Sequence, residues 1–212
     1  ATAVALDVLR GGGNAMDAAV AASATLAVTE PQSTGIGGDC FLLYHEASSG
    51  QLHGLNGSGR APAAATLDRY RAKGYTEVPA QGLYAATVPG ALHAWETAIE
   101  RFGTKSLDEL LQPAIGYAKN GFAVTPVIAD NWLKGRDLLA AYEDSKRVYL
   151  RDGEALRAGD VHRHPELAAT LEAVAKEGAK AFYQGPIAER IVKFSEANDG
   201  LFSLDDFAEH RT

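Results

Sequence analysis

Three residues of the types that bind metal ions lie close together ahead of a proline. Asp160, His162 and His164 alternate along residues 160–164, and carboxylate and imidazole groups are common zinc ligands. A structural zinc site needs four ligands, however, and no fourth ligand lies at a convincing spacing. We therefore interpret the segment as a solvated entry to a helix that begins at Pro165, and we expect no metal ion and no cofactor.

Cys40 is the only cysteine and therefore the only thiol nucleophile. It follows Asp39 at the predicted start of a strand, and the sequence does not specify a nearby histidine that would activate it. The Gly-x-Ser-x-Gly turn that presents a serine nucleophile is also absent. We interpret Cys40 as a small buried apolar side chain. The residues alone thus give no combination of nucleophile, base and oxyanion donor.

The glycine-rich stretch 33–38, STGIGG, is the one segment that resembles a phosphate-binding loop. It lacks the lysine of such loops and leads into a strand, whereas a phosphate loop opens a helix. A tight glycine turn that lets the backbone pass close to a neighbouring site is the better interpretation.

The elements around this stretch can be predicted from periodicity and capping. Apolar residues at helical spacing predict a helix over residues 1–10, ended by glycines 11–13. Asn14 and Asp17 form a capping-box pattern for a second helix, in which 18–28 are almost all small or apolar and should be buried between layers. Residues 40–45 and 51–56, with a turn at 47–50, predict a β-hairpin.

Beyond Pro62 the sequence is mainly helical. Proline and capping-box patterns mark several helix starts, including Ser106 with Glu109 and Ser203 with Asp206. The predicted helices cover 92–101, 107–119, 126–133, 165–176 and 186–197, with a short one after Ser203. We predict that residues 1–212 form a single α-rich segment whose two strands are too few for a complete sheet, and thus an incomplete domain.

Composition excludes several classes of protein. The 212 residues are 46% hydrophobic and 22% charged, which suits a globular chain. A net charge of −7 without a run of Lys and Arg argues against a nucleic-acid partner. One cysteine cannot form an internal disulfide. The most apolar stretch, 15–28, is too short to span a bilayer, so we expect no membrane partner.

Ordered motifs along the whole chain resemble the gamma-glutamyltransferase family. The most specific combination is GGNAMDAAVAA at 12–22 followed by EP at 30–31 and STGIGG at 33–38. Further matches are RAP at 60–62, VPG at 88–90, PAI at 113–115, GF at 121–122, AFYQG at 181–185 and LDDF at 204–207. We expect from this resemblance the α-rich, large-subunit part of an αββα sandwich of the N-terminal-nucleophile hydrolase type.

The resemblance also implies a mechanism whose catalytic residue is not present here. Family members cut themselves into a large and a small subunit, and the new N-terminal threonine of the small subunit attacks a γ-glutamyl carbonyl. Thr2 and Thr212 do not qualify, since Ala1 precedes Thr2 and Thr212 is at the opposite end of the chain. We therefore expect no catalytic residue in this chain. Its expected partners are the remaining large-subunit segment, the catalytic small subunit and a small γ-glutamyl or glutaryl substrate.

One substrate-binding element of the family should lie within these residues. Its pattern Asp-x-Arg-Glu-x-Ala-Pro, whose arginine grips the substrate's α-carboxylate, aligns with NGSGRAP at 56–62. Ser58 then occupies the arginine position, and Arg60 lies two residues later, on the same side if the strand continues. Ser58 and Arg60 are the predicted substrate-binding residues, with a structural salt bridge as the alternative role for Arg60.

Three functions remain open at this point. The first is cleavage or transfer of γ-glutamyl groups from compounds such as glutathione. The second is a related glutaryl or cephalosporin acylase, whose substrate lacks the α-amino acid head. The third is a catalytically silent binding or scaffold domain.

Overall fold

A computed structural model describes residues 1–212, and the chain divides into two compact units. Unit 1 comprises Ala1–Gly35 and Asp108–Ala175, and unit 2 comprises Ile36–Leu107 and Lys176–Thr212. Each unit is therefore built from two separate stretches of sequence. No helix in the chain is long and apolar enough to cross a membrane.

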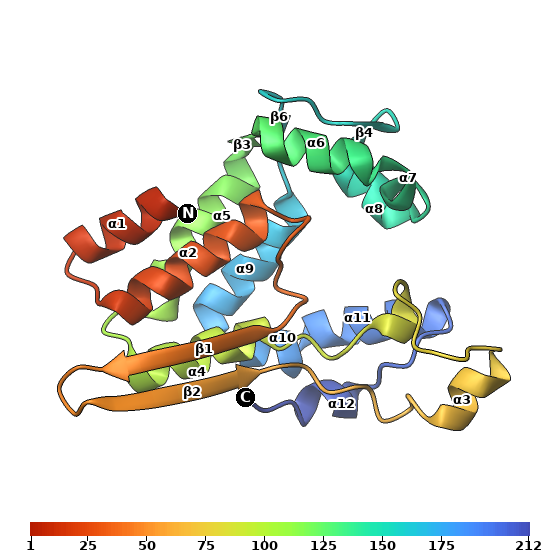
Figure 1. Ribbon diagram of the computed structural model, residues 1–212, viewed down its shortest axis with the longest axis horizontal. Helices are drawn as coiled ribbons and strands as arrows, with labels where there is room; N and C mark the ends of the chain where they lie inside the picture. Colours follow the sequence, from red (N-terminus) through yellow and green to blue (C-terminus); the bar gives the residue numbers. More distant parts are fainter. The chain divides into compact units, whose positions relative to one another are not determined.

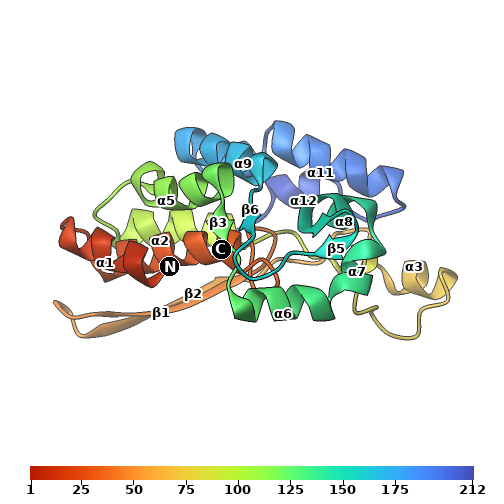
Figure 2. The ribbon, with the colours of Figure 1, turned by 90° about the horizontal axis from the view of Figure 1, so that it is seen from above.

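Unit 1 begins with two helices that lie side by side, α1 (Thr2–Arg10) and α2 (Ala15–Thr29) (Figures 1 and 2). The left-handed glycine that separates them is Gly12, with φ of 84°. Asn14 and Asp17 form the predicted capping box, in which the Asn14 side chain accepts from the backbone N–H of Asp17 at 3.0 Å and the Asp17 carboxylate accepts from that of Asn14 at 2.8 Å. Most of α2 is buried, as its small apolar residues predict.

The second stretch of unit 1 is a series of helices interrupted by short strand pairs. The helices are α5 (Leu107–Asn120), α6 (Pro126–Lys134), α7 (Arg136–Ala140), α8 (Glu143–Tyr149) and α9 (Pro165–Glu177), with the first residue of α5 and the end of α9 falling in unit 2. The antiparallel pairs are β3 (Phe122–Ala123) with β6 (Val161–His162), and β4 (Leu150–Arg151) with β5 (Glu154–Ala155). An ion pair of 3.0 Å between Lys119 and Glu172 joins α5 to α9.

Unit 2 contains the predicted hairpin. Strands β1 (Cys40–Glu46) and β2 (Gln51–Gly57) pair antiparallel, with Cys40 opposite Gly57 and Glu46 opposite Gln51. Helix α4 (Ala91–Phe102) packs against one face, where the ring centroid of Phe102 lies 4.7 Å from that of Tyr44. The other helices are α3 (Leu67–Ala72), the 3-10 helix η1 (Leu83–Ala85), α10 (Lys180–Tyr183), α11 (Pro186–Ala197) and α12 (Leu204–Ala208).

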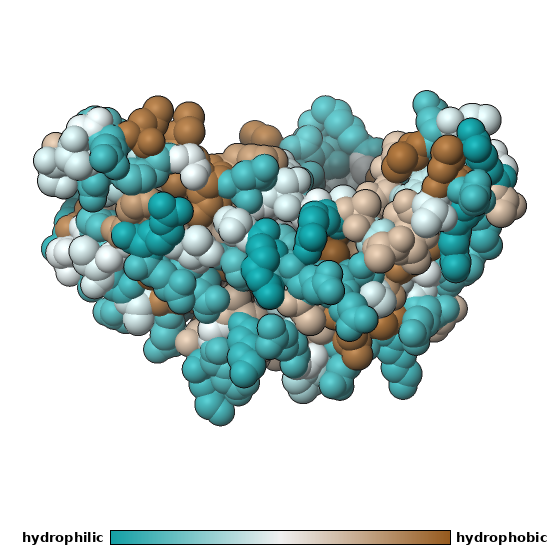
Figure 3. All heavy atoms as spheres, turned by 90° about the horizontal axis from the view of Figure 1, so that it is seen from below, coloured by the Kyte–Doolittle hydropathy of each residue, from teal (hydrophilic) through white to brown (hydrophobic).

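The hairpin leaves its other face exposed. Leu43 on β1 is 77% exposed and Leu52 on β2 is 66% exposed, although both are large apolar residues. A space-filling view of one side of the molecule shows that hydrophobic groups, in brown, occur in patches among hydrophilic ones (Figure 3). The sheet that the hairpin forms consists of two strands only, as predicted.

All five longer helices predicted beyond Pro62 are confirmed, each to within one residue, as is the Ser203–Asp206 capping box of α12. The capping role of Ser106 and Glu109 stays a prediction, as does the assignment of residues 1–212 to one incomplete domain. The shorter helices α3, α7, α8 and α10 were not predicted. Each has four to seven residues, too few for helical periodicity to show in the sequence.

Candidate substrate-binding site

The predicted substrate-binding residues Ser58 and Arg60 lie in unit 2, immediately after β2 ends at Gly57. The backbone N–H of Ser58 donates to Oδ1 of Asn56 at 3.0 Å, which turns the chain out of the hairpin ladder. The backbone N–H of Gly59 donates to Oδ1 of Asp39 at 2.9 Å. The strand does not continue to Arg60, so strand alternation does not place Ser58 and Arg60 on one side.

Two glycines let the backbone pass very close to the start of α4. A Cβ atom on Gly59 would overlap the carbonyl oxygen of Val88, and one on Gly90 would overlap that of Gly57. The N–H of Val88 donates to the carbonyl of Arg60 at 3.0 Å. These contacts fix the backbone that carries Ser58 and Arg60, so their side chains project from a rigid support.

The guanidinium of Arg60 is held by a backbone carbonyl. Its Nη2 donates to the carbonyl oxygen of Glu209 at 2.6 Å, across 149 positions of sequence. No carboxylate lies within ion-pair distance of Arg60. The structural salt bridge considered above as the alternative role of Arg60 is therefore not present. A guanidinium has five N–H donors, and a single carbonyl leaves most of them available for an incoming carboxylate. Arg60 is exposed, and Ser58 is half-buried.

A buried histidine lies beside this segment. His210 is 2% exposed, and neither of its ring nitrogens has a hydrogen-bond partner. Its ring stacks on Tyr183 with centroids 5.1 Å apart and meets His93 edge to face at 5.4 Å. Burial lowers the pKa of His210, and nearby positive charges, that of Arg60 among them, lower it further. His210 is therefore uncharged at neutral pH. It does not offer a second positive charge beside Arg60 for a carboxylate.

The side chain of His93 contacts Thr212. Its Nδ1 lies 2.7 Å from Oγ1 of Thr212 and accepts from the backbone N–H of Thr212 at 3.2 Å. Burial is the main cause that lowers the pKa of His93. Neither His93 nor His210 is predicted from the sequence, because they lie far apart in it and neither belongs to a spacing typical of a catalytic motif.

Cys40 has the properties of an inert thiol. Its side chain is half-buried at the start of β1, opposite Gly57. Burial raises the pKa of this thiol above its ordinary value, whereas an activated cysteine has a lowered pKa. The expected burial of Cys40 is thus only partial, and its raised pKa fits a packing residue better than a nucleophile.

The suggested metal ligands Asp160, His162 and His164 belong to unit 1 and have other roles. The Asp160 carboxylate accepts from the N–H of Arg157 at 2.8 Å, and Nδ1 of His164 accepts from the N–H of Leu167 at 3.2 Å in the first turn of α9. The expected solvation of this segment is wrong for His162, which is 5% exposed.

His162 is buried among aromatic rings. The ring centroid of Trp132 lies 5.0 Å from it edge to face, and that of Tyr149 stacks at 5.8 Å. Burial, with the charges of His164 and Arg151, lowers the pKa of His162 from 6.5 to about 4. His162 is therefore an uncharged part of the core of unit 1.

Comparison with known proteins matches the chain to one family over its whole length. A protein-family model described as gamma-glutamyltranspeptidase matches residues 1–212. The "Glutathione hydrolase-like YwrD proenzyme" of Bacillus subtilis (strain 168) is 40% identical over 205 residues, which cover 96% of this chain and 39% of that protein. This chain thus spans well under half the length of that relative.

Solved structures agree with the sequence match. The gamma-glutamyltranspeptidase of Helicobacter pylori superposes with a TM-score of 0.93 at 34% identity, over 98% of this chain and 60% of that one. A cephalosporin acylase from Bacillus halodurans gives a TM-score of 0.92 at 39% identity, over 98% of this chain and 40% of that one. The predicted fold class, an α-rich part of an αββα sandwich with a β-hairpin, is confirmed.

Proposed function

Because this chain belongs to the gamma-glutamyltranspeptidase family, we propose that it is the N-terminal part of the large subunit of an enzyme that hydrolyses or transfers γ-glutamyl groups. Glutathione-type compounds are the proposed donors. The observation that carries the proposal is the family match over all 212 residues, together with the close superposition on a gamma-glutamyltranspeptidase. The proposed partners are the rest of the large subunit and the catalytic small subunit.

In this proposal the nucleophile is an N-terminal threonine outside these 212 residues. The free α-amine of such a threonine acts as base for its own hydroxyl, which attacks the γ-glutamyl carbonyl without needing a histidine. Backbone amides stabilise the oxyanion, and the acyl group then passes to water or to an acceptor amine. The present chain contributes binding rather than bond cleavage.

Arg60 is the residue that we assign to the substrate's carboxylate, with Ser58 beside it as a neutral hydrogen-bonding group. Three observations support this assignment. The Arg60 guanidinium has no acidic partner, it is held by the Glu209 carbonyl, and its backbone is anchored to Val88. A guanidinium forms two parallel charge-assisted bonds to a carboxylate, whereas the Ser58 hydroxyl offers one neutral bond.

A glutaryl or cephalosporin-type acylase is the second candidate function. It is favoured by the similarity to a cephalosporin acylase structure and by Ser58, which stands where the family pattern has the arginine that grips an α-carboxylate. A substrate without an α-amino acid head makes less use of that arginine.

The deciding experiment uses the full-length processed protein and compares turnover of γ-glutamyl and glutaryl p-nitroanilides. Arg60→Ala is expected to lower kcat/KM for the γ-glutamyl compound by about tenfold to a hundredfold, the effect of losing one charge-assisted contact. Arg71→Ala removes an exposed arginine of α3 and is the matched control, with no change expected.

Each outcome separates the candidates. Undiminished γ-glutamyl preference in Arg60→Ala contradicts the role of Arg60. Glutaryl preference in the wild type, shifted toward γ-glutamyl by Ser58→Arg, supports the acylase. If the full-length protein turns over neither compound, the result supports the third function, a catalytically silent binding or scaffold domain.

A further inference from the structure

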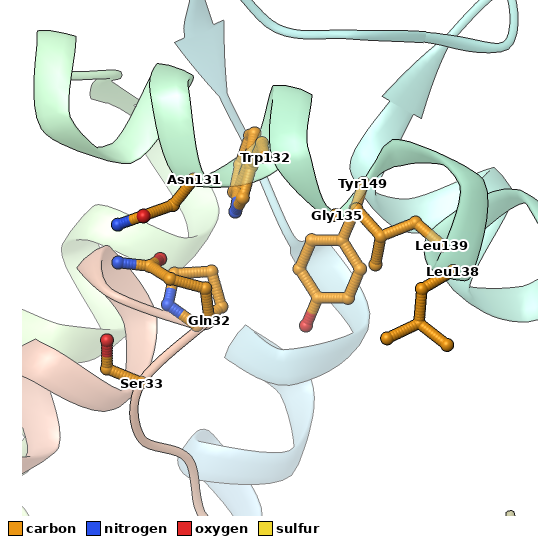
Figure 4. Close-up of a pocket in the computed structure, with 9 residues that line it drawn as sticks. Gln32, Ser33, Asn131, Trp132, Gly135, Leu138, Leu139 and Tyr149 are labelled. Carbon is orange, nitrogen blue, oxygen red and sulfur yellow. The ribbon is translucent and has the colours of Figure 1, made fainter. Parts of the chain in front are cut away.

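Unit 1 contains a cavity of about 400 Å³ whose lining includes neither Ser58 nor Arg60. The loop after α2 forms one side, the C-terminal half of α6 with Gly135 and the later residues of α7 form another, and the end of α8 closes it (Figure 4). The residues that line it are Pro31, Gln32, Ser33, Asn131, Trp132, Gly135, Leu138, Leu139 and Tyr149. Its volume lies in the range of small-molecule sites.

The apolar part of the cavity is preformed by ring packing. Trp132 and Tyr149 meet at a centroid distance of 5.8 Å, and both pack against the buried ring of His162. The side chains of Leu138 and Leu139 lie on the far side from the amides in Figure 4. Aromatic rings fixed in this way offer flat surfaces to a flat ligand and lose little side-chain freedom on binding.

Polar groups without partners in the chain line the same space. The side chains of Gln32, Ser33 and Asn131 are exposed and make no hydrogen bond within the chain. Figure 4 shows the amide ends of Gln32 and Asn131 together on one side of the cavity. Because these amides are satisfied by solvent alone, a ligand that displaces the solvent can take over their hydrogen bonds without breaking any bond inside the protein.

The cavity lining carries no charged side chain. The charged residues next to it on α6 and α7 are paired: Lys134 lies 2.6 Å from Asp130, and Arg136 lies 2.9 Å from Glu154. Burial raises the pKa of the Tyr149 hydroxyl, which therefore stays neutral and able to donate at neutral pH. An ion that entered the cavity would lose hydration without gaining a counter-charge from the lining, and this costs more than burying a neutral group.

From this combination we propose that the cavity is a binding site for a small neutral molecule with an aromatic body and a carboxamide edge. The aromatic part of the ligand packs against the rings of Trp132 and Tyr149 and the side chains of Leu138 and Leu139. The amides of Gln32 and Asn131 each offer both donors and an acceptor, so they can pair with the donor and acceptor of a ligand amide. The site does not depend on the proposed enzymatic function, since its residues all belong to unit 1 and Ser58 and Arg60 belong to unit 2.

The test is a calorimetric titration of the full-length protein with three probes that share one ring system. Indole-3-acetamide is neutral, indole-3-acetate is an anion and tryptamine is a cation. We expect the neutral probe to bind at least about tenfold more tightly than either ion, because the uncharged lining does not repay the desolvation of a charge. Equal binding of all three probes, tighter binding of either ion, or no binding of the amide overturns the proposal.

Variants locate the binding. Asn131→Leu, which keeps the size but removes the amide, is expected to weaken indole-3-acetamide binding by about fivefold to tenfold. Leu138→Trp should fill the cavity and abolish binding, whereas Leu133→Trp alters an exposed leucine of α6 outside the lining and should not. Arg60→Ala should also leave binding unchanged. A loss of binding in Arg60→Ala, or retention in Leu138→Trp, places the probe elsewhere and contradicts the proposal.

Discussion

At the scale of single residues, burial decides which titratable groups carry charge. His162 and His164 alternate with Arg163 in the sequence, in a segment that looks solvated, yet the ring of His162 is enclosed by Trp132 and Tyr149. The sequence contains no signal for this, because the enclosing rings come from α6 and from the end of α8. A histidine, which is usually solvated, is therefore part of the core of unit 1 at position 162.

The lowered pKa of His162 predicts a loss of stability in acid. The unfolded chain binds a proton near pH 6.5, but the folded chain does so only near pH 4, so stability is full above pH 6.5 and falls as the pH drops toward 4. The loss over this window is on the order of 3 kcal/mol for this group. His162→Phe should remove that part of the acid sensitivity.

Urea unfolding of the dilute chain at pH 7 and at pH 4.5 measures the effect. His45→Gln, at an exposed position of β1, is the control and should unfold with the wild-type dependence on pH. If His162→Phe loses as much stability on acidification as the wild type, the buried neutral state of His162 is wrong.

At the scale of elements, the segment after β2 is shaped by close backbone contacts. The sequence pattern 56–62 indicated where this segment lies, but it left open whether the strand continues through it. The strand ends because the side chains of Asn56 and Asp39 take the N–H groups that the ladder would otherwise use. Competition between side chain and backbone for these donors depends on where Asp39 lies in space.

Gly59 provides the test of this arrangement. Gly59→Ala forces a Cβ against the Val88 carbonyl, so the backbone must shift, and we expect a loss of roughly 2 to 3 kcal/mol in the free energy of unfolding. Gly54→Ala is the matched control within β2, since its Cβ would meet only Leu43 at 3.8 Å, and it should change stability by less than about 1 kcal/mol. Equal effects of the two substitutions on chemical unfolding would falsify the close-contact explanation.

At the scale of the whole molecule, the exposed apolar surface differs from the sequence-based expectation in one respect. The sequence places the 15–28 helix between layers and gives the hairpin only two strands, so we expect both to leave apolar surface uncovered where the rest of the sandwich is missing. Helix α2 is in fact largely buried, whereas Leu43 and Leu52 on the outer face of the hairpin are exposed. The uncovered surface therefore belongs to the sheet, whose two strands also leave unpaired edges.

We predict that the isolated 212-residue chain self-associates through this hairpin face. The double substitution Leu43→Lys and Leu52→Lys should shift it toward the monomer in sedimentation velocity, because lysines on an exposed sheet face repel a second copy. Val127→Lys alters an exposed apolar residue of α6 and should have little effect. A wild-type chain that stays monomeric at high concentration and binds no apolar dye contradicts the prediction.

We also predict that the isolated chain turns over no γ-glutamyl p-nitroanilide. The proposed nucleophile and oxyanion groups lie outside it, so the chain has no group that could carry out the reaction, whatever the proposed role of Arg60. The measurement compares the purified chain with a heat-denatured sample and with the full-length processed protein. Reproducible turnover above the heat-denatured control would show that the chain contains its own catalytic group.

The sequence by itself determined the elements and the family. Capping residues such as Asn14, proline positions such as Pro186, and alternating apolar residues in the hairpin act over a few neighbouring positions, so they can be recognised without knowing the fold. The ordered motifs also located Ser58 and Arg60 by alignment with the family pattern.

Only the tertiary structure decided how distant residues combine. The Glu209 carbonyl meets the Arg60 guanidinium across 149 positions, each unit is assembled from two separate stretches, and the cavity of unit 1 joins Gln32 to Asn131. Such contacts depend on how helices and strands pack, and packing is set by the shapes of many side chains together. No local pattern around Arg60 or Gln32 contains that information, which is why the proposed substrate-binding segment was located from the sequence and the residues that contact it were not.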